Sequence, residues 1–181
     1  AGLGAIEVAF TTPGAVVAIA ELVSTRRGLV GAGTVLQVEQ AKAALAAGAS
    51  FLVAPVDSGI LLEHAHAAGA VAIVGGLTPQ EIWNVHALGA DFVKVFPVRA
   101  MGGPNYLRDL LAPFPDLRLL VSGGVDAANY REYLAAGAQL VALGSTLTPP
   151  ALVAKQDWQG IIEHVRGTMG VTRDGTPGRV P

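Results

Sequence analysis

The sequence predicts an α/β fold, a (β/α)8 TIM barrel, and three observations lead to that prediction. An Ala-rich segment ending in Gly-Ala recurs along the chain, and each copy runs into a short apolar stretch. Gly suits the left-handed residue that ends a helix, and an apolar run too short for a helix suits a strand buried on both faces. Regular alternation of such strands with helices predicts parallel pairing through right-handed crossovers.

The repeated phrase and the apolar runs together predict seven strands. These are Ala5–Phe10, Leu29–Thr34, Ser50–Pro55, Val71–Val74, Asp91–Val98, Leu117–Ser122 and Gln139–Gly144. Helical patterns such as Val38–Ala47 lie between them. Turn or cap residues stand where helices are expected to start, at Thr12-Pro13, Thr78–Glu81 and Asp126.

A closed barrel and a doubly wound sheet both fit this alternation, and the start of the chain favours the barrel. Residues 1–5 resemble the end of a helix, so we expect a first strand and helix to be absent from this chain. With that unit in place, the seven strands become strands two to eight, and no edge of the sheet stays unpaired. The predicted barrel domain is 1–171, and 172–181 is a surface tail.

The composition excludes several classes of protein. With 51% hydrophobic and 14% charged residues, the 181-residue chain is far too apolar for a disordered protein and fits one domain. The net charge of −2 comes from charges spread along the chain, so no basic stripe is available for nucleic acid. No apolar run approaches the roughly 20 residues of a membrane helix. Because Cys is absent, disulfides and thiolate chemistry are excluded, and we expect a cytoplasmic protein.

Lys94 interrupts a run, Asp91–Pro97, that otherwise has the composition of a strand buried on both sides. Burial lowers the pKa of a lysine, and the neutral amine is the nucleophile that forms a Schiff base with a ketone. Lys94 is therefore the predicted imine-forming residue. The alternative is a structural lysine whose ammonium pairs with a carboxylate while its stem lies along the core.

Glu7 interrupts the strand Ala5–Phe10 in the same manner. If one unit is missing, Glu7 lies on strand two and Lys94 on strand six, and alternate strands of a barrel contribute to the same inward layers. We therefore expect the two side chains to face each other at the barrel mouth. There Glu7 can move protons during carbinolamine dehydration and carbon–carbon cleavage. A structural Glu7–Lys94 ion pair is the alternative.

Two glycine-containing loops predict a phosphate site. They are Val121–Val125 and Leu143–Thr146, at the ends of the last two predicted strands. Glycine permits close backbone approach, and hydroxyl and amide hydrogens can hold an anion near a helix N-terminus. Barrels often bind phosphate in the loops after strands seven and eight.

The segment Gly31–Thr34 ends the strand after Glu7 and can present the Thr34 hydroxyl to a substrate carboxylate. It lacks the third Gly and the following acidic residue of a dinucleotide fingerprint, so no nucleotide is expected. The four histidines fall on predicted helices and are expected to be structural or solvent-facing: His64, His66, His86 and His164.

Four motifs, in register along one chain, resemble the 2-keto-3-deoxy-6-phosphogluconate (KDPG)/4-hydroxy-2-oxoglutarate (KHG) aldolase family. They are Ile6–Val8, Gly31–Thr34, Phe92–Pro97 and Ser122–Gly124. The resemblance implies a (β/α)8 barrel that is usually a homotrimer and needs no metal or other cofactor. It also implies an imine on Lys94, with Glu7 in proton transfer.

The same resemblance implies a set of substrate-binding residues. Thr34 would touch the pyruvate carboxylate, Phe96 would line the pocket, and the phosphate would be held by Ser122, Gly123, Gly124, Gly144 and Ser145. Gluconate-type members carry an arginine four residues after the catalytic glutamate, where this chain has Thr11. Carboxylate binding must therefore differ. The sequence around Thr11 looks closer to the 2-keto-3-deoxy-6-phosphogalactonate (KDPGal) aldolase branch.

The reaction implied by the resemblance is reversible cleavage of a phosphorylated 2-keto-3-deoxy sugar acid to pyruvate and glyceraldehyde 3-phosphate. Two alternatives stay open at this point. One is cleavage of 4-hydroxy-2-oxoglutarate to pyruvate and glyoxylate, in which the phosphate site is dispensable. The other is a catalytically inactive barrel that binds sugar phosphates. No nucleic-acid or membrane partner is expected.

Overall fold

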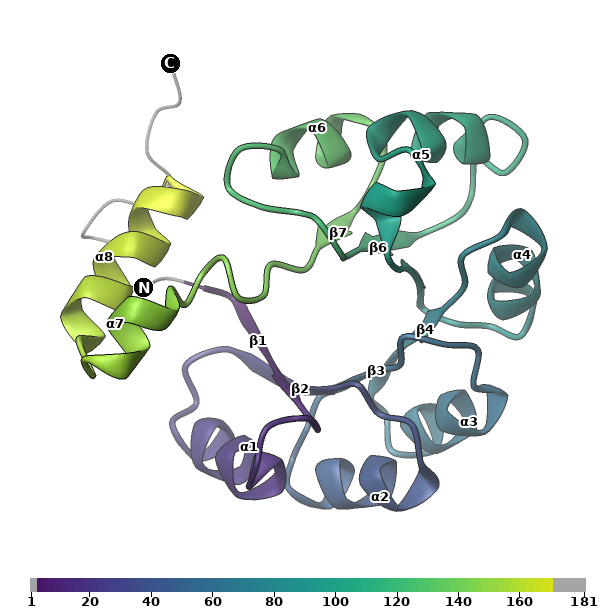
Figure 1. The fold of residues 1–181 in the computed structure, drawn as a ribbon. Helices are drawn as coiled ribbons and strands as arrows, with labels where there is room; N and C mark the ends of the chain where they lie inside the picture. Colours follow the sequence, from purple (N-terminus) through teal and green to yellow (C-terminus); the bar gives the residue numbers. More distant parts are fainter. Residues whose placement is uncertain (1–2, 171–181) are drawn as a thin grey trace.

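A curled parallel sheet with helices on its outer side is the central feature of the computed structural model, which describes residues 3–170 (Figure 1). Within these residues the sheet has seven strands in chain order, and each pairs in parallel with the next. The α/β class is thereby confirmed, and the curl is that of a half-barrel of the TIM type. The edge strands β1 and β7 are not hydrogen-bonded to each other.

All seven predicted strands are confirmed, most of them shorter than expected. They are β1 Ala5–Ala9, β2 Leu29–Gly33, β3 Phe51–Val53, β4 Val71–Gly75, β5 Phe92–Val95, β6 Leu119–Val121 and β7 Leu140–Val141. The predicted strand Asp91–Val98 is wrong at its end. The chain turns through Phe96-Pro97, and Val98 begins a 3₁₀ helix, η1 Val98–Met101, which holds apolar Val98 in the core.

The helices that follow these strands cover the outer face. They are α1 Ala15–Ser24, α2 Val38–Ala46, α3 Gly59–Ala67, α4 Pro79–Ala87, α5 Pro104–Leu111, α6 Tyr130–Ala135, α7 Pro150–Ala154 and α8 Trp158–Met169. Thr78 caps α4 as predicted, because its side chain accepts from the Glu81 N–H while Glu81 accepts from the Thr78 N–H. At α1 and α6 the predicted start is early. Left-handed Gly14 precedes α1, and Asp126 caps a turn ahead of Asn129.

The two faces of the sheet bury different clusters, because successive side chains of a strand point to opposite faces. Toward the helices pack Val8, Val30, Ala32, Leu52, Ala54, Ala72, Val74, Val93, Val95, Leu119 and Val121. The inner cluster is small and contains Val53, Ile73 and Leu120 with Phe51, Phe92 and Ala142 around it. Lys94 alternates with outward-facing Val93 and Val95, and Glu7 precedes outward-facing Val8. Both functional candidates therefore point into the curl.

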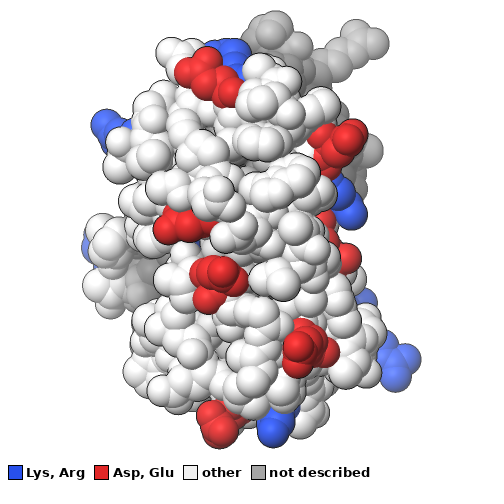
Figure 2. Space-filling view, turned by 90° about the vertical axis from the view of Figure 1, so that its right-hand side faces the viewer, with Lys and Arg blue, Asp and Glu red and all other residues white. Residues whose placement is uncertain are grey.

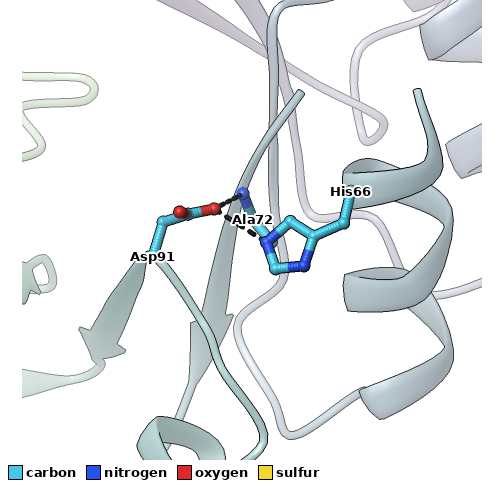
Figure 3. A network of polar contacts seen from close by, with 3 residues as sticks. All are labelled: His66, Ala72 and Asp91. Carbon is cyan, nitrogen blue, oxygen red and sulfur yellow. Dashed lines mark hydrogen bonds and ion pairs between the residues drawn. The ribbon is translucent and has the colours of Figure 1, made fainter. Parts of the chain in front are cut away.

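Asp91 fixes the start of the strand that carries Lys94 (Figure 3). Its carboxylate accepts a hydrogen bond of 2.8 Å from the Ala72 N–H at the start of β4, and it lies 3.0 Å from Nε2 of His66 on α3. The Asp91 N–H in turn donates to the Ala72 carbonyl at 3.0 Å. These contacts couple β4, β5 and α3 at the end of the sheet opposite the predicted site.

The helices α7 and α8 pack on each other and lie apart from α3 and α4 (Figure 1). His164 on α8 reaches back to the loop after β7, where its Nε2 lies 2.8 Å from the Thr146 carbonyl oxygen. The predicted tail 172–181 lies outside the described residues. Among residues 3–170, none of the helices is both long and apolar enough to cross a membrane.

The charge distribution on one face agrees with the absence of a basic stripe. Figure 2 shows Lys and Arg atoms mainly near the edges of this view, interspersed with acidic groups and separated by large uncharged areas. This face offers no continuous positive surface for a nucleic-acid backbone.

Candidate active site

Lys94 is the only buried charged residue among those the structure describes, with 7% of its surface exposed. Its backbone lies on β5 between Gly75 of β4 and Leu120 of β6. No buried side-chain nitrogen or oxygen within residues 3–170 lacks a hydrogen-bond partner. Because no hydrogen bond of Lys94 Nζ occurs in that range, the nitrogen must reach solvent. The stem is enclosed, and the amine is accessible to a small molecule.

The structural alternative for Lys94 required a carboxylate partner. In the described part of the chain, no carboxylate oxygen lies within 4.0 Å of Nζ; the sole ion pair there is His66–Asp91. Burial lowers the pKa of Lys94 from its ordinary value, and the Glu7 carboxylate opposes that shift without reversing it. The absence of an ion pair within residues 3–170 argues against the structural alternative, and the lowered pKa makes the neutral amine easier to reach than in an exposed lysine.

Glu7 is held against the backbone of β2. A Cβ built on Gly33 would lie 1.7 Å from Glu7 Oε1, so the carboxylate occupies the space that Gly33 leaves open. The side chain as a whole is exposed because β1 is an edge strand, but its carboxyl group is directed inward. Burial raises the pKa of Glu7, and the Lys94 ammonium lowers it to a smaller extent. A raised pKa suits a group that both accepts and donates protons near neutrality.

The remaining residues expected to contact pyruvate lie at the carboxyl ends of the same strands. The Phe96 ring centroid is 5.4 Å from Lys94 Nζ, and Phe96 is 41% exposed. Thr34 follows β2 in a left-handed conformation, with φ of 54°, and is half-buried. Thr11 lies in the exposed turn after β1. The structure thus brings Lys94, Glu7 and Phe96 into one neighbourhood, and Thr34 and Thr11 follow β2 and β1 at the same end of the sheet.

The two predicted phosphate loops meet at one cavity of about 380 Å³. Ser122, Gly123, Gly124, Gly144 and Ser145 all line it, and so does Phe96. Within residues 3–170, the amide N–H groups of Gly123, Gly124, Ser145 and Thr146 donate no hydrogen bond. Gly123 and Gly124 have φ of 86° and 87°, a conformation that favours glycine. Hydroxyls and unpaired amides around a concavity form a site suited to an anion.

Thr146, at the end of the second predicted segment, also lines the cavity, and two charged lining residues were not predicted from the sequence: Arg99 and Asp126. Arg99 lies on η1, five residues after Lys94, and that proximity to the end of β5 is the signal that could have pointed to it. The Asp126 Oδ1 accepts hydrogen bonds from the N–H groups of Ala128 and Asn129, at 2.8 and 3.2 Å. This carboxylate is therefore already engaged by backbone donors.

None of the four histidines lines the cavity. His64 contacts a carbonyl of its own helix, His66 pairs with Asp91, and His164 contacts the Thr146 carbonyl. His86 packs beside the ring of Trp83, with centroids 5.6 Å apart. Their expected structural or solvent-facing character is confirmed by these contacts. No three His, Asp or Glu side chains gather as a metal-ligand group in the part of the chain described.

Comparison with known proteins gives these residues a context. A family model described as KDPG and KHG aldolase matches residues 1–164. The chain belongs to the KDPG and KHG aldolase family. It is accordingly an aldolase, a carbon–carbon lyase.

Individual members of the KDPG and KHG aldolase family match most of the chain. A 2-dehydro-3-deoxy-phosphogluconate aldolase of Pseudomonas aeruginosa is 36% identical over 158 residues, which are 87% of this chain and 72% of that protein. A KDPG aldolase from Legionella pneumophila, solved with pyruvate captured as a covalent carbinolamine intermediate, superposes with a TM-score of 0.84. It is 30% identical, and the match covers 92% of this chain and 82% of that chain.

A native KDPGal structure also superposes on the aldolase, with a TM-score of 0.79 and 27% identity. The match covers 94% of this chain and 85% of that chain. Both the gluconate and the galactonate branches of the resemblance are therefore represented among its structural neighbours.

Proposed function

We propose that the protein is a class I aldolase that cleaves a 2-keto-3-deoxy-6-phospho sugar acid to pyruvate and glyceraldehyde 3-phosphate. One observation carries the proposal: Lys94 is buried, carries no ion pair within residues 3–170, and points with Glu7 into the curl of the sheet. The anion cavity at the same end of the strands supplies a place for the phosphate.

The first half of the reaction forms the imine. The neutral Nζ attacks the C2 carbonyl carbon, the carbonyl π electrons move to the oxygen, and a proton passes from the nitrogen to that oxygen to give a neutral carbinolamine. Loss of water then forms the C=N bond of a protonated imine, with the Glu7 carboxyl donating the proton that the leaving hydroxyl requires. Glu7 ends this stage as a carboxylate.

The second half breaks the carbon–carbon bond. The Glu7 carboxylate removes the C4 hydroxyl proton, the C3–C4 bond breaks, and its electron pair moves into the imine to form an enamine. Glyceraldehyde 3-phosphate leaves as the aldehyde. Protonation of the enamine at C3 and hydrolysis of the imine release pyruvate and restore Lys94. The imine is the electron sink throughout, so the mechanism requires no metal.

Residues at the carboxyl ends of the strands position the substrate. Thr34 and Thr11 supply hydroxyls for the pyruvate carboxylate, and the Phe96 ring lines the approach to Lys94. The loops with Ser122, Gly123, Gly124, Gly144 and Ser145 take the phosphate. Since Thr11 stands where gluconate-type members have an arginine, we expect the galactonate-type acid to be the preferred substrate. A comparison of kcat/KM for the two phosphorylated acids tests this preference.

Borohydride trapping tests the imine. The protein is incubated with pyruvate, reduced, digested and analysed by peptide mass spectrometry. We expect a pyruvyl adduct on Lys94 that is lost in Lys94→Ala and kept in Lys42→Ala, a matched change on the exposed surface of α2. A folded protein that gives no adduct on Lys94 would contradict the proposal and would favour the catalytically inactive barrel.

Fold and assembly have finer proposals of their own. We propose a closed (β/α)8 barrel in which a strand outside residues 3–170 pairs with the edges of β1 and β7. Partly exposed apolar residues on these edges support it, with Ile6 40% and Leu140 38% exposed. N-terminal sequencing of the intact protein tests the strand.

The family resemblance supports a cytoplasmic homotrimer. Measurement of the molecular size in solution tests the trimer, and cell fractionation tests the location.

A further inference from the structure

We propose that Arg99 binds the phosphate of the substrate and sets the preference of the enzyme for phosphorylated acids. The inference rests on the proposed function and adds to it a residue from outside the two glycine loops. Arg99 is the only basic side chain among the described residues that line the phosphate cavity.

The backbone holds Arg99 beside the glycine loop. The Val98 N–H donates to the Ser122 carbonyl at 2.9 Å, and the Arg99 N–H donates to the Gly123 carbonyl at 3.1 Å. The start of η1 is thereby hydrogen-bonded to the loop after β6. Any movement of this loop would carry Arg99 with it.

The stem of Arg99 lies directly across Gly124. A Cβ built on Gly124 would be 2.4 Å from Arg99 Cβ and 2.6 Å from its Cδ. Gly124 thus serves two purposes, since it adopts a left-handed conformation and also leaves room for the arginine stem. The contact places the stem of the side chain along the wall of the cavity, while Arg99 as a whole is exposed.

The guanidinium has no competing partner in the described structure. Residues 3–170 contain no ion pair and no side-chain hydrogen bond of Arg99. The acidic residue that lines the cavity, Asp126, forms no ion pair with Arg99, and its Oδ1 accepts from two backbone N–H groups in the turn before α6. The positive charge of Arg99 is therefore available to an anion.

A phosphate monoester carries nearly two negative charges at neutral pH, whereas the loop amides and hydroxyls are neutral donors. A guanidinium adds a full charge and a planar pair of N–H donors that matches two phosphate oxygens. 4-Hydroxy-2-oxoglutarate has no phosphate, and its second carboxylate is attached directly to C4, so it extends less far from Lys94 than a phosphate carried on C6. Arg99 should therefore raise the affinity for phosphorylated substrates alone.

The test compares Arg99→Ala, Arg99→Lys and the control Arg108→Ala, which removes an exposed arginine from α5. Steady-state kinetics are measured with the phosphorylated 2-keto-3-deoxy acid and with 4-hydroxy-2-oxoglutarate. We expect Arg99→Ala to raise KM for the phosphorylated acid by roughly 10-fold or more, as for a lost charged hydrogen bond. KM for 4-hydroxy-2-oxoglutarate and pyruvate trapping on Lys94 should stay unchanged. For the phosphorylated acid, the KM of Arg99→Lys should lie between the values of the wild type and of Arg99→Ala.

Two results would overturn the inference: KM values of Arg99→Ala that match Arg108→Ala, or equal losses with both substrates. Titration with inorganic phosphate is an independent readout, for which we expect a roughly 10-fold weaker Kd in Arg99→Ala. If the wild-type protein neither turns over nor traps pyruvate, the proposed function fails. The titration still decides on Arg99, because an unchanged Kd would refute its contact with phosphate.

Discussion

The carboxylate of Glu7 on β1 lies directly over the α-carbon of Gly33 on β2, where a Cβ would be 1.7 Å from Oε1. Gly33 sits opposite Ala9 in the strand register, so Glu7 leans along the sheet toward the carboxyl ends of the strands. Gly33 has an ordinary strand backbone and no positive φ. Its role is therefore to leave space for the carboxylate, not to permit an unusual backbone conformation.

Gly33→Ala should displace Glu7 while leaving the fold intact. The strand accepts Ala, and the flexible end of the Glu7 side chain can move away from the new methyl group. General acid–base catalysis contributes about 10²–10⁴-fold, so we expect kcat to fall by at least about 10-fold. Steady-state kinetics with the phosphorylated acid measure this loss, and urea unfolding measures stability.

Gly167→Ala is the matched control, because a Cβ at Gly167 meets nothing within 4 Å. This position lies within α8, where Ala is favoured over Gly, so the control should keep full activity and gain stability slightly. Full activity in Gly33→Ala would show that the position of Glu7 over Gly33 is unimportant.

Removal of the Glu7 charge should shift the pH dependence of imine formation. Burial already lowers the pKa of Lys94, and the Glu7 carboxylate partly counteracts this by stabilising the ammonium. In Glu7→Gln that counteraction disappears, so the pKa of Lys94 should fall further. The rate of pyruvate trapping by borohydride, measured against pH, should then reach its half-maximum at a lower pH than in the wild type. A shift to higher pH would mean that the two groups are not coupled as the structure indicates.

Lys94→Met should abolish activity and stabilise the fold. The pKa of Lys94 is lowered on folding, so the protonated lysine opposes folding below its folded-state pKa. Replacing it with an apolar side chain of similar length should raise the free energy of unfolding by about 1 kcal/mol at pH 7. Urea unfolding measures the difference, which should shrink as the pH rises toward the ordinary lysine pKa of 10.5. Lys42→Met on α2 is the control, and a Lys94→Met protein less stable than that control would contradict the prediction.

Asp91→Ala should weaken the start of the strand that carries Lys94. Burial by itself raises the pKa of Asp91, but hydrogen bonds from Ala72 and His66 outweigh it and leave the pKa lowered. The carboxylate therefore stabilises the fold above its ordinary pKa, and this contribution is lost as the pH falls through the folded-state value. Since the group is partly exposed, we expect a loss of about 1 kcal/mol at pH 7.

His66→Ala separates the two contacts of Asp91. It keeps the Ala72 hydrogen bond and removes only an exposed partner, so its cost in urea unfolding should stay below about 1 kcal/mol and below that of Asp91→Ala. Equal costs for the two variants would assign the stabilisation to the histidine contact and not to the tie between β4 and β5.

The sequence by itself determined the strand order, singled out Lys94, which the structure buries, and identified the loops that line the cavity. Each depends on a local pattern. A strand buried on both faces is a continuous apolar run, so a single charged residue such as Lys94 or Glu7 stands out, and glycines at strand ends mark the loops. Strand ends were less well determined. The prediction extended β5 through Val98 because apolar residues continue beyond the point where the chain turns.

Only the tertiary structure decided which residues complete the site. The role of Gly33 depends on the Glu7 carboxylate, which belongs to another strand. The role of Arg99 depends on its position across Gly124, which is 25 positions further along the chain. Both relationships are non-local packing contacts, to which no period or motif in the sequence corresponds. The physical reason is that each glycine leaves space for a side chain of another element, which reaches it only through strand pairing or loop packing. The two residues are therefore complementary in space and unrelated in sequence.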